Sequence, residues 1–115
     1  MTYDAYRIVI EDDGEFDRAF TTYAMKRPHG ASRLVMRLEA FAGNPQGQGE
    51  YLRGAGRLAF YVVPPRARLD ADGEAGFLAR VDDSDRSVCP VRFLAPDAKR
   101  RWSEHESWAE RILGI

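Results

Sequence analysis

The stretch Arg57–Pro65, which reads Arg-Leu-Ala-Phe-Tyr-Val-Val-Pro-Pro, decides the fold. Its aromatic and β-branched side chains suit a pleated surface that is buried on at least one side. The two prolines that follow Val63 lack the backbone N–H that a strand needs, so they end the run. We therefore expect this stretch to form a central strand of the only sheet, with the other elements packed around it.

Length and composition predict one globular domain that spans residues 1–115. Hydrophobic residues make up 44% and charged residues 30% of the chain, which are ordinary shares for a folded protein of this size. The 17 basic residues nearly balance the 18 acidic ones, so no overall charge attracts nucleic acid or an anionic membrane. Only two of the basic residues are lysine. This bias is typical of a GC-rich bacterial genome, although arginine also suits the recognition of carboxylates and phosphates.

The chain is expected to be cytoplasmic. Cys89 is the only cysteine, so no disulfide can form within the chain and a reducing compartment is indicated. Residues 1–7 lack the basic and apolar regions of a signal peptide. No stretch approaches the roughly 18 apolar residues that a membrane-spanning helix requires, so no membrane partner is expected.

Two elements are expected before residue 30. The segment Tyr3–Ile10 carries aromatic and β-branched residues on both faces, which predicts an inner strand. From Glu15 to Lys26, apolar residues recur at helical spacing, which predicts an amphipathic helix that ends before Pro28. The recurring positions are Phe16, Ala19, Phe20, Tyr23 and Ala24.

Residues 32–42 satisfy two periods at once. Their apolar positions fit a helix, which local propensity favours, and equally fit a strand with alternating faces. A helix would leave residues 43–56 as a long loop without structure, which compact domains seldom contain. A strand would instead make residues 44–49 a hairpin loop and residues 50–63 its partner, bent at its two glycines. We favour the strand.

The rest of the chain is expected to continue as an antiparallel meander and to end in a helix. Turn residues separate short strand-like runs at residues 66–70, 74–81 and 86–94. Pro90 cannot donate to a neighbouring strand, so the last run should lie at an edge or contain a bulge. A capping box and the apolar positions after it predict a C-terminal helix at about residues 103–113.

The predicted fold class is therefore α+β. We expect a mainly antiparallel sheet of about five to six strands, which suits the number of strand-like runs in a single packed layer. One helix, at about residues 15–26, follows the first strand. The second helix is the C-terminal one.

Three patterns that resemble cofactor or metal sites have simpler explanations. Gly54–Ala59 matches the glycine spacing of dinucleotide-binding loops, but that motif precedes a helix and here a strand follows. The acidic groups at Asp12–Asp13, Asp70 with Asp72, and Asp82–Asp85 lack the ligand spacing of a calcium loop and suit solvated turns. One cysteine and two separate histidines form no zinc pattern. We therefore assign no cofactor and no metal ligand.

No catalytic residue is assigned either. Cys89 shares a strand face with Val91 and Phe93, where a buried and unreactive thiol is expected. His105 lies between two glutamates, but neighbouring helix residues point in different directions and do not converge on one substrate atom. The balance favours a protein that is not an enzyme.

The candidate binding residues are mostly basic. Lys99–Arg101 directly precede Trp102, and this combination suits single-stranded nucleic acid through phosphate pairing and base stacking. Two further arginines alternate on the strand predicted after the double proline. The full set is Arg66, Arg68, Arg100, Arg101, Trp102 and His105.

Three functions are open at this point. The favoured one is a small cytoplasmic protein-binding module, such as an adaptor, inhibitor or immunity-type factor. Its partner would be another protein or a second copy of the chain, and an edge strand near Pro90 would serve such an interface. The second is a small-ligand-binding domain or enzyme with a pocket between the sheet and the C-terminal helix, where His105 and Tyr61 or Arg68 would supply polar groups. The third is a nucleic-acid binder that uses Lys99–Trp102.

Overall fold

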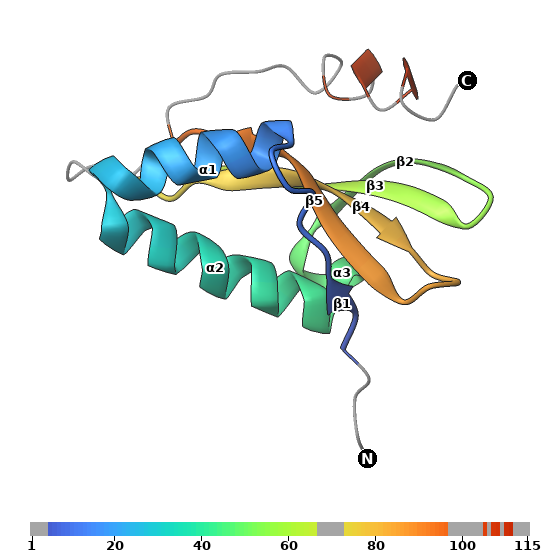
Figure 1. Ribbon diagram of the computed structural model, residues 1–115. Helices are drawn as coiled ribbons and strands as arrows, with labels where there is room; N and C mark the ends of the chain where they lie inside the picture. Colours follow the sequence, from blue (N-terminus) through green and yellow to red (C-terminus); the bar gives the residue numbers. More distant parts are fainter. Residues whose placement is uncertain (1–4, 67–72, 97–104, 106, 109, 112–115) are drawn as a thin grey trace.

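The computed structural model describes residues 5–66, 73–96, 105, 107, 108, 110 and 111. The elements are β1 (Arg7–Ile8), α1 (Glu15–Lys26), α2 (Pro28–Gly43), α3 (Pro45–Gln48), β2 (Glu50–Ala55), β3 (Leu58–Val63), β4 (Gly76–Asp82) and β5 (Ser87–Leu94). Within these residues, five strands form one sheet in the order β1-β5-β4-β3-β2 (Figure 1). β1 is parallel to β5, and the other pairs are antiparallel. The predicted α+β class with a mainly antiparallel sheet is confirmed.

The predicted central strand forms β3, an inner strand. It pairs with β2 on one side and with β4 on the other. Its side chains alternate, so that Tyr61 and Val63 contact the helix side of the sheet while Phe60 and Val62 contact the opposite side. All four are buried because both faces of the sheet are covered here. The double proline ends the strand, as predicted.

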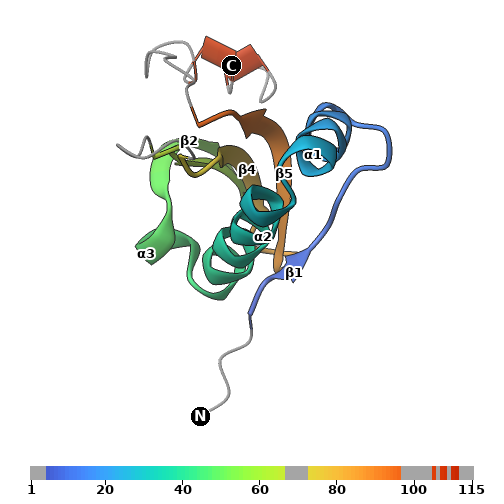
Figure 2. The ribbon, with the colours of Figure 1, turned by 90° about the vertical axis from the view of Figure 1, so that its left-hand side faces the viewer.

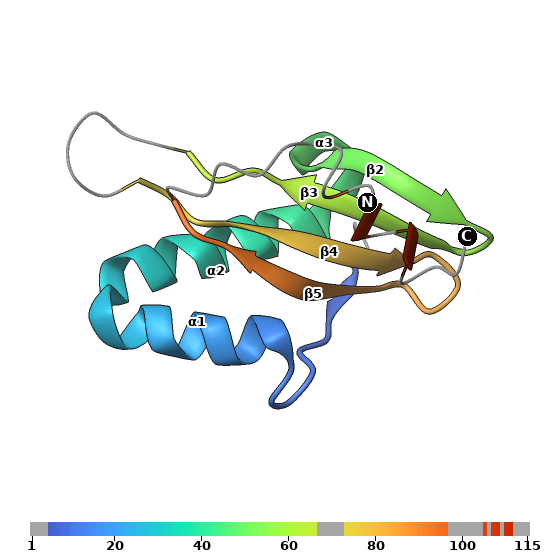
Figure 3. The same cartoon turned by 90° about the horizontal axis from the view of Figure 1, so that it is seen from above.

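The sheet separates two apolar cores. The larger core lies between the sheet and the helices, where the rings of Phe41 and Phe77 meet edge to face with centroids 5.6 Å apart. In the smaller core on the other face, Phe60 meets Trp108 at 5.6 Å. Figure 2 shows α2 on one side of the sheet and the described residues between 105 and 111 on the other, and Figure 3 shows α1 beside β5. The described residues between 105 and 111 are helical, in agreement with the predicted C-terminal helix.

The strand predicted for residues 32–42 is wrong, because these residues belong to α2. Pro28 occupies the first turn of this helix, where its missing N–H breaks no hydrogen bond. The objection from loop length fails because the next residues form the short helix α3. Its N-cap is Asn44, whose side-chain oxygen accepts a hydrogen bond from the Gly47 N–H at 3.2 Å. β2 begins two residues after α3 ends, so no long loop is left.

Residues 50–63 form a hairpin, and the prediction of one long bent strand is wrong. β2 and β3 are antiparallel, and their last pair is Ala55 with Leu58. The turn between them contains Gly56 at a φ of 61°, a backbone conformation that glycine adopts without steric cost. The glycine spacing that resembles a dinucleotide motif is therefore part of a tight turn between two strands.

β1 is a short edge strand, and the prediction of an inner strand at Tyr3–Ile10 is wrong. Its residues pair in parallel only with the first two residues of β5. Polar contacts with the β4–β5 turn hold the segment in place. The Tyr6 hydroxyl donates to Asp83 at 2.6 Å, and the Arg7 guanidinium pairs with Asp85 at 2.7 Å. Because β1 is at the edge, Ile8, Val9 and Ile10 remain 36%, 36% and 40% exposed.

β5 contains the bulge predicted at Pro90. Leu78 pairs with Arg92 and Ala79 pairs with Pro90, so Val91 is an extra residue on β5. Of the strand predicted at residues 66–70, Arg66 forms an isolated bridge with Glu74, and the remainder lies outside the described residues. None of the helices in the described ranges has the length and apolar character needed to cross a membrane.

Candidate functional site

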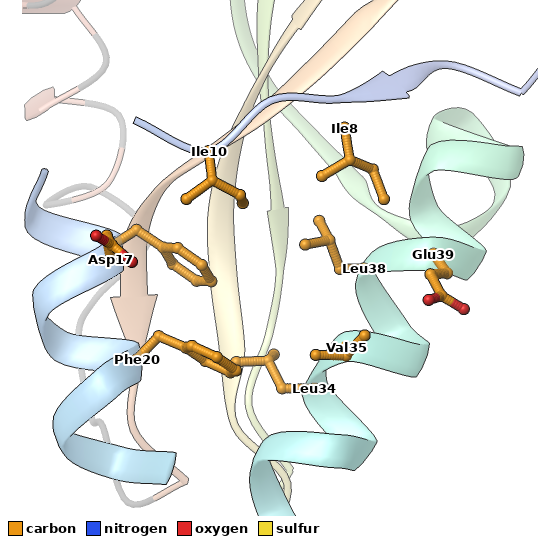
Figure 4. Close-up of a pocket in the computed structure, with 9 residues that line it drawn as sticks. Ile8, Ile10, Asp17, Phe20, Leu34, Val35, Leu38 and Glu39 are labelled. Carbon is orange, nitrogen blue, oxygen red and sulfur yellow. The ribbon is translucent and has the colours of Figure 1, made fainter. Parts of the chain in front are cut away.

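An apolar groove opens between α1 and α2, beside β1 (Figure 4). Its volume is about 290 Å³. Three segments that are separate in the sequence line it: β1 with the residues just after it, the first half of α1, and the middle of α2. The lining residues are Ile8, Ile10, Phe16, Asp17, Phe20, Leu34, Val35, Leu38 and Glu39. We call this site the α1–α2 groove.

The floor of the groove is part of the larger core. Phe16, Leu34 and Leu38 are only 5%, 1% and 6% exposed. Phe20, one helical turn after Phe16, stacks its ring on that of Phe16 with centroids 5.7 Å apart. Leu34 and Leu38 have the same spacing on α2, which places them on one side of that helix. Because these residues are packed by folding, the shape of the floor exists before any partner binds.

The walls of the groove are apolar and exposed. Ile8 and Ile10 lie two residues apart on an extended segment, so both point to the same side. Figure 4 shows their side chains directed toward the space between the two helices. Val35, on α2, is 41% exposed. Water therefore contacts branched aliphatic side chains on two sides of the groove.

The rim carries negative charge. Asp17 lies on α1 and Glu39 lies on α2, so one carboxylate flanks the apolar floor on each side (Figure 4). The Asp17 carboxylate accepts a hydrogen bond from the backbone N–H of Asp13 at 3.0 Å, which fixes the turn before α1. No lysine, arginine or histidine is among the lining residues.

The titratable side chains among the described lining residues are the carboxylates of Asp17 and Glu39. No serine, cysteine, histidine or lysine is among the described residues that line the groove. Pockets for small ligands have volumes of about 300–1,000 Å³, so the groove, at about 290 Å³, matches the smallest of them. A large apolar side chain on another protein fits its size and chemistry.

Two of the six predicted binding residues lie in the described part of the chain. Arg66 exchanges backbone hydrogen bonds of 2.8 and 2.7 Å with Glu74, and their side chains pair at 3.9 Å. His105 is buried, with an exposure of 7%. Neither residue lines the α1–α2 groove. The other four, Arg68, Arg100, Arg101 and Trp102, lie outside the described residues.

Arg66 borders a second, more polar hollow of about 250 Å³ beside α2. Arg37 lines the same hollow and donates hydrogen bonds to the carbonyl oxygens of Ala75 at 2.6 Å and Pro64 at 2.8 Å. Burial lowers the pKa of the Arg37 guanidinium, and the nearby charge of Arg66 lowers it further. Because the Arg37 guanidinium already binds two carbonyls, its evident role is to join α2 to the sheet.

Tyr61 and the C-terminal helix contact opposite faces of the sheet. Tyr61 belongs to the larger core, where its ring meets that of Phe41 at 5.9 Å. Trp108 packs on Phe60 in the smaller core. Tyr61 therefore does not supply a polar group to a pocket between the sheet and the C-terminal helix, which removes one of the candidates named for such a pocket.

Cys89 is buried in β5, and burial raises the pKa of its thiol. The predicted burial of this thiol is confirmed. The acidic residues that begin at Asp82 form a turn, as predicted. The Asp82 carboxylate accepts hydrogen bonds from the backbone N–H groups of Ser84 and Asp85, both at 3.0 Å. Within the described ranges, no three or more histidine, cysteine, aspartate or glutamate side chains gather closely enough to hold a metal ion.

One sequence pattern points to part of the groove. Residues 6–10 carry apolar side chains on both faces, which indicates either an inner strand or an edge strand with an exposed apolar face, and the structure has the second arrangement. The other lining residues follow from how three segments meet in space. No family model matches the chain, and no curated protein or solved structure compared with it is significantly similar.

Proposed function

We propose that the protein is a non-enzymatic, cytoplasmic protein-binding module, of the adaptor, inhibitor or immunity-factor type, that binds its partner through the α1–α2 groove. The observation that carries the proposal is the combination of a buried apolar floor with exposed aliphatic walls. Exposed apolar residues that cluster around a hollow are typical of binding sites, whereas single exposed apolar residues are common on any surface.

The energetics of such a site favour a protein partner. A few large apolar side chains that enter fitted pockets provide most of the binding free energy in protein interfaces. The groove offers a pocket of this kind, with Ile8, Ile10 and Val35 around it. Burying one aliphatic side chain contributes about 1.5 to 3 kcal/mol, so the anchor and the three wall residues together supply a substantial share of an interface.

The site is also preorganised. Its floor is core, and the wall formed by β1 is held by the hydrogen bond from Tyr6 to Asp83 and the ion pair between Arg7 and Asp85. A surface that is ordered before binding loses less conformational entropy when the partner arrives. The three lining segments therefore act as one rigid surface.

The proposal is tested with two neighbouring substitutions on α2. Val35→Asp places a charge inside the groove, whereas Met36→Asp places the same charge on the adjacent residue, which is 68% exposed and does not line the groove. Each purified variant and the wild type are used to capture proteins from a lysate of the source organism, followed by mass spectrometry. Sedimentation of the wild type alone detects a homodimer.

The expected result is a partner that the wild type and Met36→Asp retain and that Val35→Asp loses. Both variants should unfold at denaturant concentrations close to one another, because both positions are exposed. If no protein exceeds background and the chain is monomeric, or if Val35→Asp retains the partner fully, binding through this groove is refuted.

A further inference from the structure

We infer that the partner segment that enters the α1–α2 groove carries one large apolar side chain with an arginine or lysine on either side of it. This inference rests on the proposed function and adds the chemistry of the partner to it. The two parts of the inference, a single anchor and basic flanks, come from different observations.

The single anchor follows from size. The groove holds about 290 Å³ and is closed below by Phe16, Leu34 and Leu38, which belong to the core. Pockets that enclose a drug-sized ligand occupy about 300–1,000 Å³, so this groove has the volume of the smallest of them. One aromatic or large aliphatic side chain fills a hollow of this size and leaves the partner backbone at its mouth.

The basic flanks follow from charge. The residues that meet the partner beside its anchor are Asp17 on one helix and Glu39 on the other. Among the described residues, none forms a hydrogen bond or an ion pair with Glu39. An acidic partner would be repelled there, and a neutral one would cover carboxylates without replacing their water. Arginine or lysine on the partner supplies the missing positive charge.

The neighbouring carboxylates behave differently, which makes Glu39 distinctive. Glu11 lies 3.6 Å from Arg80, and Glu15 lies 3.4 Å from Arg92. Arg80 and Arg92 therefore pair with carboxylates that do not line the groove. Among the described lining residues, Asp17 and Glu39 leave the rim with a net negative charge, which a basic partner segment would neutralise.

The test uses a phage-displayed library of random dodecapeptides, selected on the wild-type protein. Three variants are selected in parallel. Glu39→Lys reverses the charge at the rim and breaks no hydrogen bond or ion pair among the described residues. Glu50→Lys makes the same change at an exposed position on β2 and controls for net charge. Val35→Asp removes the apolar wall.

The expected peptides on the wild type carry an aromatic or large aliphatic residue with arginine or lysine within a few positions on each side. Selection on Glu39→Lys should lose the basic preference on one side of the anchor, and selection on Glu50→Lys should keep it. A synthetic peptide from the wild-type selection should bind Glu39→Lys roughly five-fold more weakly or worse, since an exposed ion pair changes affinity by about two- to five-fold and repulsion adds to this. Added salt should reduce the difference.

Two other outcomes separate the inference from the function on which it rests. In the first, the wild type binds peptides that have apolar anchors but no basic flanks, and Val35→Asp loses them. This result would overturn the inference and would still support binding through the groove. Peptides enriched equally on the wild type and on Val35→Asp, or not enriched at all, would overturn both.

Discussion

Replacing Gly76 with alanine tests how closely β4 approaches the end of β3. Gly76 is the first residue of β4 and is buried. A Cβ atom built on it would overlap the carbonyl oxygen of Val63 and would lie 2.6 Å from the Pro65 nitrogen and 2.7 Å from the Pro64 carbonyl carbon. All three atoms belong to the backbone, so no side chain can rotate away to make room.

The size of the effect follows from those contacts. Forcing an extra methyl group into a packed site costs typically about 1 to 3 kcal/mol. The displaced atoms here are the backbone of a double proline, which is stiff, so we expect a loss of about 3 kcal/mol or more in the free energy of unfolding. A protein of this size has about 5 to 15 kcal/mol in total, so the variant should unfold at a much lower denaturant concentration.

The same substitution at Gly43 is the matched control. Gly43 is the last residue of α2, and no heavy atom lies within 4 Å of a Cβ built on it. Alanine is favoured over glycine in a helix by up to about 1 kcal/mol, so Gly43→Ala should be neutral or slightly stabilising. Both variants add the same methyl group, but only Gly76→Ala is expected to lower the free energy of unfolding.

Equilibrium unfolding in urea, followed by circular dichroism, measures both changes. The midpoint should fall for Gly76→Ala and stay or rise for Gly43→Ala, with similar dependence on urea in each case. If Gly76→Ala keeps the wild-type free energy of unfolding to within about 0.5 kcal/mol, β4 does not approach the double proline as closely as described. The β3–β4 register that brings them together would then also be refuted.

Three further outcomes are expected. Arg37→Met should lower the free energy of unfolding by about 2 to 4 kcal/mol, because it removes two charged hydrogen bonds to backbone carbonyls, one of them partly buried. An unchanged free energy of unfolding in urea would contradict this expectation. The hydrogen bond to Asp83 raises the pKa of Tyr6, so it stabilises the fold below the ordinary tyrosine pKa of about 10 and is lost as pH rises through the folded value. Tyr6→Phe should therefore be less stable near neutral pH and lose less stability between neutral and strongly alkaline pH, as measured by urea unfolding across that range. Cys89 should resist iodoacetamide at about pH 8 until the protein unfolds, because its buried thiol has a raised pKa; rapid labelling of the folded protein, detected by mass spectrometry, would contradict its burial.

Local patterns predicted the elements whose signals agree with one another. The helix at residues 15–26 matches α1, because its apolar spacing, the turn before it and Pro28 after it all indicate the same bounds. The bulge at Pro90 follows from the chemistry of one residue, which lacks an N–H in any context. In both places the decisive information lies within a few residues of the chain.

The prediction failed where the signals conflict. Residues 32–42 fit two periods, and the choice rested on the assumption that residues 43–56 have no structure of their own. That assumption was wrong because Asn44 caps a short helix and Gly56 makes a tight turn. Asn44 and Gly56 therefore give residues 43–56 structure of their own, so a helix at residues 32–42 leaves no long loop behind it.

The position of β1 depends on contacts that its own residues do not reveal. The apolar faces of residues 6–10 suggest burial, yet the segment is held at the edge of the sheet by Tyr6 and Arg7, which bind two aspartates of the β4–β5 turn about 80 residues later. No local pattern identifies that pairing, because aspartates in turns are common.

The segment around β1 is held by the polar side chains of Tyr6 and Arg7, so its isoleucines remain available to a partner. The hydrogen bond and the ion pair fix the segment through polar groups that remain close to water, so its position does not depend on full burial of Ile8 and Ile10. Isoleucine is an unusual choice for residues that stay 36% and 40% exposed beside a groove, since polar residues would serve an edge strand better and would prevent unwanted pairing. A partner that covers the groove would bury both side chains and give their apolar character a role that folding alone does not.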